Sequence, residues 1–250
     1  MKSKEFIIEE ELNAMHTRII NGIAKQYNIS PKNMDQIVKI TQDAGMKLNV
    51  IEWLVQIAQR CQPYIKEVGW DYIFRLYRGV YSDVGEFIQK NVRLENRKPK
   101  SMDPFLYDQI NNYFIEKFGA PFRNSMLATG DLHHTIRFGE VYVVFPRGDF
   151  KYLWGENVDD FNFAYSDFLA SDVVDKNVEG SVWSYDNQDL ISDLFMEHFI
   201  KKVKWHTTDL KKAIDEEVEI MIRCKQYYGI NVREHQEHFP AMKQIMKLAL

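Results

Sequence analysis

The stretch VYVVFPRGDFKYLW at residues 141–154 decides the fold class of this chain. Its first five residues are β-branched or aromatic, which is typical of a buried strand. Pro146 and Gly148 then predict a turn, because proline presets φ and glycine tolerates positive φ. FKYLW, residues 150–154, predicts the returning strand of a hairpin, with its three aromatic side chains on one face.

Upstream of this segment, the first 65 residues have a helical pattern. Apolar residues recur at three-to-four spacing over residues 5–27, which predicts a helix. Ser30 and Pro31 predict the start of a second helix, since serine caps a first turn and proline fits its first position. A third helix is predicted to open at Asn49 and to be ended by Pro63. Residues 1–65 are therefore expected to form a helical subdomain.

The remainder, residues 66–250, mixes predicted strands and helices. Asp103 and Pro104 predict the start of a helix that Gly119 closes. The other predicted elements are a strand over 72–80, a loop over 91–102, an amphipathic helix over 187–203, a short helix capped by Thr207 or Thr208, a strand over 217–224 and a final helix from Pro240. Helices followed by strands interleaved with helices indicate an α+β fold with a helical N-terminal lobe.

Composition and charge narrow the class of protein. The 250 residues are 45% hydrophobic and 27% charged, which is enough apolar material for a core. The net charge of −4 predicts no general attraction to nucleic acid or anionic lipid. The chain has only two cysteines and no apolar leader, and it lacks an apolar run of the roughly eighteen residues that a membrane span needs. These features predict a cytoplasmic protein without a membrane partner.

The sequence EEVEIMIRC at residues 216–224 carries the first candidate functional groups. On a strand, Val218 would face a core, and Glu217 and Glu219 would share the opposite face, about 7 Å apart. Paired carboxylates can divide roles, one stabilising positive charge on a sugar and the other helping a nucleophile to lose its proton. The alternative is a solvated strand face without chemistry.

Two further segments offer polar groups beside apolar ones. In LYRG, residues 76–79, Arg78 is a bidentate donor suited to phosphate or carboxylate, and Gly79 lets a ligand approach the backbone. In FRNSMLATG, residues 122–130, Ser125 and Thr129 supply hydroxyls that can orient a carboxylate or a ribose. The alternatives are an ordinary ion pair for the arginine and turn or cap roles for the hydroxyls.

Taken in this order, the motifs Leu-Tyr-Arg78-Gly, Asn-Ser125-Met and Glu217-Val-Glu219 resemble those of the ADP-ribosyltransferase superfamily, in its arginine–serine–glutamate branch. The resemblance extends over residues 70–235, and part of it is similar to transferase-like proteins of tailed phages. It implies a core of two small packed sheets with flanking helices, and a host-cytoplasmic location for a phage protein. The middle motif departs from the family's Ser-Thr-Ser, so Thr129 stays an alternative to Ser125.

The resemblance implies that NAD is the substrate and that ADP-ribose passes to a protein side chain with release of nicotinamide. Arginine is the implied acceptor, because Glu-x-Glu accompanies arginine acceptors in this superfamily. Glu219 would stabilise the oxocarbenium-like state of the ribose, positioned by Ser125, and Glu217 would orient or deprotonate the acceptor.

The phosphates or the adjacent ribose would be held by Arg78, together with Gly79 and Tyr77. The aromatic side chain that stacks on nicotinamide is left open among Tyr77, Tyr142, Phe150 and Trp154.

Other signals are weaker. The pairs His133–His134 and His235–His238 lack enough neighbouring ligands to close a metal site, so no metal is predicted. Two functions compete with the enzyme: a non-catalytic interaction or nucleotide-binding protein on the same fold, and a nucleic-acid-binding accessory protein. The latter would use a basic patch of lysines around Trp205. The alternative is that this patch is an ordinary solvated helix face. Its members are Lys201, Lys202, Lys204, Lys211 and Lys212.

Overall fold

Four helices begin the chain in the computed structural model, which describes residues 4–82, 84–95, 97 and 102–250. They are α1 (Lys4–Gln26), α2 (Pro31–Asp43), α3 (Asn49–Arg60) and α4 (Gln62–Val68). The predicted start of α2 is confirmed, because Ser30 Oγ accepts a hydrogen bond from the Asn33 N–H (3.2 Å). The prediction for Pro63 is wrong. It lies in the first turn of α4, where a missing N–H costs no hydrogen bond.

The first sheet is built around the strand that the sequence marks most clearly. It has the order β1-β4-β8-β2, and every pairing is antiparallel. Its strands are β1 (Tyr77–Val80), β2 (Phe87–Asn91), β4 (Glu140–Arg147) and β8 (Gln226–Asn231). The strand expected over 72–80 is confirmed only at its end, since residues 72–74 form a turn, and β2 was not predicted.

The second sheet has the order β3-β7-β5-β6, again antiparallel. Its strands are β3 (Met126–Ala128), β5 (Lys151–Gly155), β6 (Trp205–His206) and β7 (Ile220–Arg223). The predicted hairpin at 141–154 is therefore wrong: β5 is a strand, but it pairs with β7 and not with β4. The turn between β4 and β5 carries the chain from one sheet to the other.

A short backbone bridge joins the two sheets beside the candidate site. Tyr77 N–H donates to the Thr129 carbonyl (2.8 Å), and Thr129 N–H donates to the Tyr77 carbonyl (3.0 Å). These two bonds fix the start of β1 against the end of β3. Residues that are far apart in the sequence, in the Arg78 and Ser125 motifs, are thereby brought side by side.

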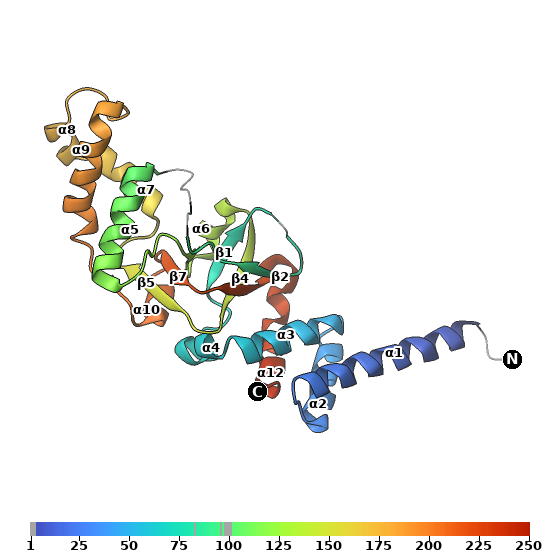
Figure 1. Ribbon diagram of the computed structural model, residues 1–250. Helices are drawn as coiled ribbons and strands as arrows, with labels where there is room; N and C mark the ends of the chain where they lie inside the picture. Colours follow the sequence, from blue (N-terminus) through green and yellow to red (C-terminus); the bar gives the residue numbers. More distant parts are fainter. Residues whose placement is uncertain (1–3, 83, 96, 98–101) are drawn as a thin grey trace.

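A helical lobe covers the second sheet (Figure 1). It contains α5 (Pro104–Phe118), α7 (Phe161–Leu169), α8 (Asp172–Asn177), α9 (Tyr185–Phe195) and a π-helical turn, η2 (Met196–Ile200). The predicted start of α5 is confirmed, because Asp103 Oδ1 accepts from the N–H groups of Phe105 and Leu106 (2.8 and 3.1 Å). Gly119 closes α5 in a left-handed conformation, φ 73°, as predicted. The helix expected over 187–203 ends earlier, at Ile200.

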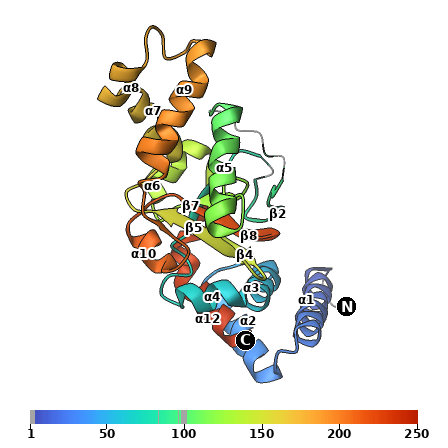
Figure 2. The same cartoon turned by 60° about the vertical axis from the view of Figure 1, so that its left-hand side comes forward.

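The C-terminal helix α12 (Phe239–Leu248) packs on α2 and α3, at the opposite end from this lobe (Figure 2). Gln59 on α3 ties the region together, since its Nε2 donates to the carbonyls of Tyr27 (2.8 Å) and Ala249 (3.2 Å). Buried side chains of α2, α3, β4 and α12 belong to one continuous core. The start predicted for α12 near Pro240 is confirmed. The division at residue 65 stays a prediction.

The strand expected over 217–224 is shorter, because the chain turns before it. Glu217 adopts a left-handed conformation, φ 58°, and β7 begins only at Ile220. The short helix α10 (Leu210–Asp215) is preceded by Asp209, so the predicted cap at Thr207 or Thr208 is wrong. The remaining short elements are α6 (Leu132–Thr135), η1 (Ile136–Phe138), α11 (Val232–His235) and η3 (Gln236–His238).

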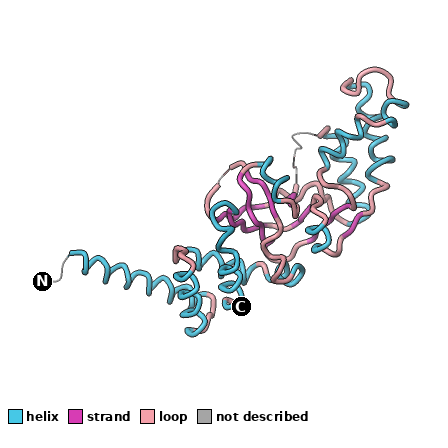
Figure 3. The backbone as a smooth tube through the Cα atoms, turned by 180° about the vertical axis from the view of Figure 1, so that it is seen from behind, coloured by secondary structure: helices cyan, strands magenta, loops and turns pink. Residues whose placement is uncertain are grey.

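The mixture of helices with two small antiparallel sheets confirms the α+β class, and Figure 3 shows the strands lying between the two helical regions. Its correspondence to an ADP-ribosyltransferase core stays a prediction. Among the described helices, none has the length and apolar character to cross a membrane.

Candidate functional site

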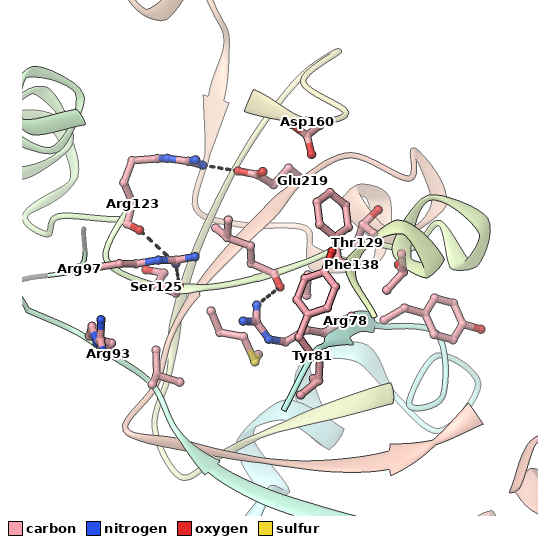
Figure 4. Close-up of a pocket in the computed structure, with 18 of the residues that line it drawn as sticks. Arg78, Tyr81, Arg93, Arg97, Arg123, Ser125, Thr129, Phe138, Asp160 and Glu219 are labelled. Atoms are coloured by element: carbon pink, nitrogen blue, oxygen red, sulfur yellow. Dashed lines mark hydrogen bonds and ion pairs between the residues drawn. The ribbon is translucent and has the colours of Figure 1, made fainter. Parts of the chain in front are cut away.

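A cavity of about 690 Å³ opens where the two sheets meet (Figure 4). Its walls come from β1 and β3, from the loop after β2 and from the segment between β5 and α7. This volume lies in the range of ordinary small-molecule sites. Of the seven residues singled out by the sequence motifs, six line it: Tyr77, Arg78, Gly79, Ser125, Thr129 and Glu219.

Arg78 lies on β1, and part of its guanidinium is already used by the protein. Nη1 donates to the Leu127 carbonyl (2.6 Å), and the guanidinium lies 5.9 Å from the centre of the Tyr227 ring. Nε is buried and has no hydrogen-bond partner among the described residues. The side chain is therefore held on the cavity wall with donor capacity left for an anionic ligand.

Gly79 lines the cavity, and it has a packing role besides the predicted contact with a ligand. A Cβ at this position would lie 2.5 Å from both Cβ and the carbonyl oxygen of Phe138. The glycine thus lets η1 pack closely on β1, which places Phe138 in the cavity wall.

The two candidate hydroxyls have different environments. Thr129 Oγ1 donates to the Glu217 carbonyl (2.7 Å) and accepts from the Asp131 N–H (3.1 Å), so it is committed to the turn. Ser125 is 2% exposed, and its Oγ finds no partner within the described part of the chain. Because Ser125 also lines the cavity, its hydroxyl is free to bond a ligand atom there. Ser125 is the better candidate of the two.

The two glutamates do not share a strand face as predicted. Glu219 precedes β7, its N–H donates to the Val158 carbonyl (2.8 Å), and its side chain reaches the cavity. Glu217 is exposed on the left-handed turn, outside the described cavity lining. The role of acceptor base expected for Glu217 is therefore not supported by its position.

Arg123 is the residue that the sequence motifs missed. Its guanidinium forms an ion pair with Glu219 Oε1, and the two side chains are only 5% and 9% exposed. It also lies 4.1 Å from the centre of the Phe161 ring, and its Nε is another buried donor without a described partner. Taking such a pair out of water is costly, so its surroundings must hold it closely.

The backbone around Arg123 is fixed by several bonds. Its N–H donates to Asn111 Oδ1 (3.0 Å), and its carbonyl accepts from the Tyr107 hydroxyl (2.8 Å). Arg97 also donates to the Ser125 carbonyl. Burial lowers the pKa of Arg97, but an arginine remains charged under all ordinary conditions. The neighbouring Lys98 and Lys100, part of the predicted loop, lie outside the described residues.

Opposite these arginines the cavity has an acidic end. Asp160 is 6% exposed, and its Oδ1 caps α7 by accepting from the N–H groups of Asn162 (2.6 Å) and Phe163 (3.2 Å). Its Oδ2 lies 3.2 Å from His134 Nε2. Asp159, which is exposed, also lines this end.

The lining is therefore divided by charge. Figure 4 shows Asp160 and Glu219 in the upper part of the view, Arg93 and Arg97 at the left and Arg78 below them, while Arg123 reaches from the left to pair with Glu219. Such a cavity suits a ligand that is anionic in one part and cationic or sugar-like in another.

Of the aromatic side chains left open for stacking, only Tyr77 lines the cavity. Tyr142 is fully buried, with its hydroxyl donating to the Gly85 carbonyl (2.8 Å), and Trp154 is fully buried, with Nε1 donating to the Thr208 carbonyl (2.9 Å). Phe150 packs against Tyr64 and Tyr152. Four further tyrosine and phenylalanine rings line the cavity. Those of Tyr107 and Tyr227 are buried, and those of Tyr81 and Phe138 are more exposed.

The signals for other functions are explained by local contacts. Three lysines of the predicted basic patch are ion-paired: Lys201 with Glu197, and Lys204 and Lys212 with Glu156. Hydrogen bonds with Lys204 and then with His206 lower the pKa of Glu156 to about 2, and the Glu156 carboxylate offsets the charge of Lys204 and Lys212. Trp205 is stacked on Phe161. Within the described residues no group of three or more His, Cys, Asp or Glu side chains is arranged to hold a metal.

Comparisons of the chain with protein-family models, curated proteins and solved structures return no match. The function must therefore be argued from the cavity itself.

Proposed function

We propose that this protein is a mono-ADP-ribosyltransferase, which moves ADP-ribose from NAD to a protein side chain and releases nicotinamide. The observation that carries the proposal is the meeting of Arg78, Ser125 and Glu219 around one cavity between two small sheets. Arg78 lies on β1, Ser125 directly before β3 and Glu219 directly before β7, which is hydrogen-bonded to β3. In the family that these motifs resemble, the arginine, the serine and the glutamate meet at one site. No short-range feature of the sequence requires these three residues to meet.

The charge distribution supports NAD as the ligand. NAD carries an anionic pyrophosphate and a cationic nicotinamide ring. In the proposed pose the pyrophosphate lies against Arg78 and the loop arginines Arg93 and Arg97, whose fork-shaped donors suit phosphate. The nicotinamide ribose then lies towards Glu219 and Ser125. Tyr77, Tyr81 and Phe138 are the rings in the lining that are not buried, and they are available for stacking.

In this pose Glu219 performs the central electrostatic step. As the bond between ribose C1′ and nicotinamide breaks, positive charge develops on the ribose, and a fixed carboxylate stabilises it. Arg123 contacts Oε1 of Glu219, which holds the carboxylate in place and leaves the second oxygen for the ribose hydroxyl. Ser125, with its unpartnered hydroxyl, supplies a further hydrogen bond to the ribose or to Glu219. Arginine is the acceptor that the family resemblance implies.

One observation favours a second candidate, a nucleotide-binding protein without turnover. The Arg123–Glu219 pair neutralises the carboxylate that the reaction uses. If this pair persists with NAD bound, the negative charge facing the ribose is weakened, and the cavity binds NAD without cleaving it.

The experiment that separates the two candidates uses NAD labelled in its adenylate phosphate, with cell lysate as the source of acceptor. We expect labelled protein and free nicotinamide from the wild-type chain, and a loss of about 100-fold or more for Glu219→Gln. Glu216→Gln is the matched control, because Glu216 is an exposed carboxylate paired with Lys212 (3.5 Å). Saturable NAD binding without nicotinamide release would support the second candidate, and the absence of NAD binding would reject both.

A further inference from the structure

The acceptor side chain must lose a proton during transfer, and the cavity offers one well-held group to receive it. Glu217, the group that sequence reasoning assigned to this step, is exposed outside the described lining. We propose that His134, oriented by Asp160, is the general base for the acceptor. This inference rests on the proposed transferase function and deepens it.

The position of Asp160 places the His134–Asp160 pair close to Glu219. Val158, two residues before Asp160, accepts the N–H of Glu219 (2.8 Å), so the segment leading into α7 is fixed directly beside the catalytic carboxylate. Asp160 itself is immobilised as the cap of α7, accepting two backbone N–H groups. A capping carboxylate needs no further partner, yet its second oxygen contacts His134.

His134 is held for this role from several sides. Its backbone N–H donates to Asp131 Oδ1 (2.9 Å), which starts α6. Its ring packs against Phe138 (5.3 Å between ring centres) and Phe163 (5.9 Å), while the side chain keeps 15% exposure on the cavity wall. In many enzymes a weak nucleophile is activated by a base that a carboxylate orients, and here His134 is the base and Asp160 the carboxylate.

The other titratable groups at this end suit the role less well. Asp159 is exposed and adjoins the cap, but the structure shows no partner that orients its carboxylate within the described residues. Asp160 uses both oxygens in the cap and in the contact with His134. The arginines on the cavity wall are permanently charged and cannot take a proton.

In the proposed step, His134 takes up the proton that the acceptor loses. With Nε2–H donated to Asp160, the other ring nitrogen of His134 carries a lone pair. The bond between ribose C1′ and nicotinamide breaks, and its electron pair leaves with nicotinamide, which becomes neutral. The acceptor nitrogen forms a bond to C1′ and gives its proton to His134. The Asp160 carboxylate stabilises the imidazolium that results.

The test compares His134→Ala with His133→Ala, its exposed neighbour outside the described lining. With labelled NAD and lysate, we expect transfer by His134→Ala to fall about 100-fold or more, the usual contribution of a general base. Added imidazole should restore part of it, because a small base can enter the space left by the ring. NAD affinity, measured by titration calorimetry, should change by less than about threefold, a difference below 1 kcal/mol. His133→Ala should behave as the wild type.

Three results would overturn the inference. These are unchanged transfer by His134→Ala, a loss that imidazole does not rescue, or a larger loss in Asp159→Asn than in His134→Ala. Wild-type turnover shows that the proposed function holds in each of these cases, so only the assignment of the base would fall. A wild-type chain that releases no nicotinamide from NAD would overturn the function and the inference together.

Discussion

At the residue scale, the most informative feature is a set of buried polar atoms that have no partner in the described chain. Such atoms occur at several places in the molecule, and three of them, Ser125 Oγ and the Nε atoms of Arg78 and Arg123, belong to residues that line the same cavity. Leaving a buried donor or acceptor unpaired costs roughly 1–3 kcal/mol. A folded protein that retains such groups in one place is best explained by a ligand that completes them.

Ser125→Ala tests this explanation against its neighbour Thr129. Because Ser125 Oγ makes no described bond, its removal should leave the free energy of unfolding unchanged or raise it by up to about 1–3 kcal/mol, while NAD affinity or transfer falls about tenfold. Thr129→Val should lower stability by about 1–3 kcal/mol, since it strands the Asp131 N–H and the Glu217 carbonyl. Urea unfolding and NAD titration measure both. A Ser125→Ala variant that loses stability but not NAD binding would contradict the prediction.

His235 should make stability depend on pH. Burial lowers its pKa, Glu86 and Glu234 act in the opposite direction, and His238 and Lys47 act with burial. The unfolded chain therefore takes up the proton first as pH falls below the ordinary value of about 6.5, and stability decreases until the folded pKa is also passed. Above that ordinary value both states are neutral, and this contribution is constant.

Urea midpoints at pH 7.5 and 5.5 measure the effect. His235→Leu should show a smaller drop between the two pH values than the wild type, because leucine has no ring to take up the proton. The ring nitrogens of His235 make no described hydrogen bond, and Nε2 lies 3.9 Å from Glu86 Oε2. His133→Gln, at an exposed site, should retain the wild-type drop. Equal drops in wild type and His235→Leu would show that another group controls the acid dependence.

At the element scale, signals confined to neighbouring residues predicted structure well. Ser30 and Asp103 cap α2 and α5 through bonds to residues two or three positions ahead, which sequence alone contains. The partner of a strand, by contrast, cannot be predicted from neighbouring residues. β5 follows β4 after a turn typical of hairpins, yet it pairs with β7, about 70 residues later, because each sheet must bury its own apolar face.

The residues of the candidate site also fall into two groups, those that short motifs predict and those that only the fold brings together. Arg78, Ser125 and Glu219 were recognisable because short motifs surround them, and the structure brings them to one cavity. Arg123 pairs with Glu219 across 96 residues, and His134 with Asp160 across 26, and no local spacing predicts either pair. Arg123 sits inside a quoted motif, but an arginine beside a serine gives no sign that it will be buried.

Gly79→Ala probes how β1 and η1 meet. The added Cβ would lie 2.5 Å from Phe138, so β1 and η1 must separate, at a cost of about 1–3 kcal/mol. The same change at Gly22, where no atom lies within 4 Å, should be neutral or slightly stabilising because alanine favours helix α1. Thermal melting by circular dichroism measures both. Equal melting temperatures for the two variants would argue against the close contact at Gly79.

At the scale of the whole molecule, the two ends of the chain contribute unequally to the core. Figure 1 shows α1 extending away from the body, and its junction with α2 is anchored by the buried residues Ile23 and Tyr27. Nearer the N-terminus of α1, Met15 and Ile19 are exposed. On α12, by contrast, Met242, Ile245 and Met246 are fully buried against α2 and α3.

Paired truncations should therefore have opposite outcomes. Removing residues 1–18 leaves Ile23 and Tyr27 in place, and the melting temperature should change by no more than a few degrees. Removing 239–250 takes away three buried side chains of α12 and exposes the α2 and α3 surfaces beneath them, at roughly 1.5–3 kcal/mol for each large buried side chain lost. That sum is comparable with the total stability of a typical domain, about 5–15 kcal/mol, so cooperative unfolding should be lost. A cooperative melt in the second truncation, followed by circular dichroism, would show that α12 is not part of the folding unit that carries the site.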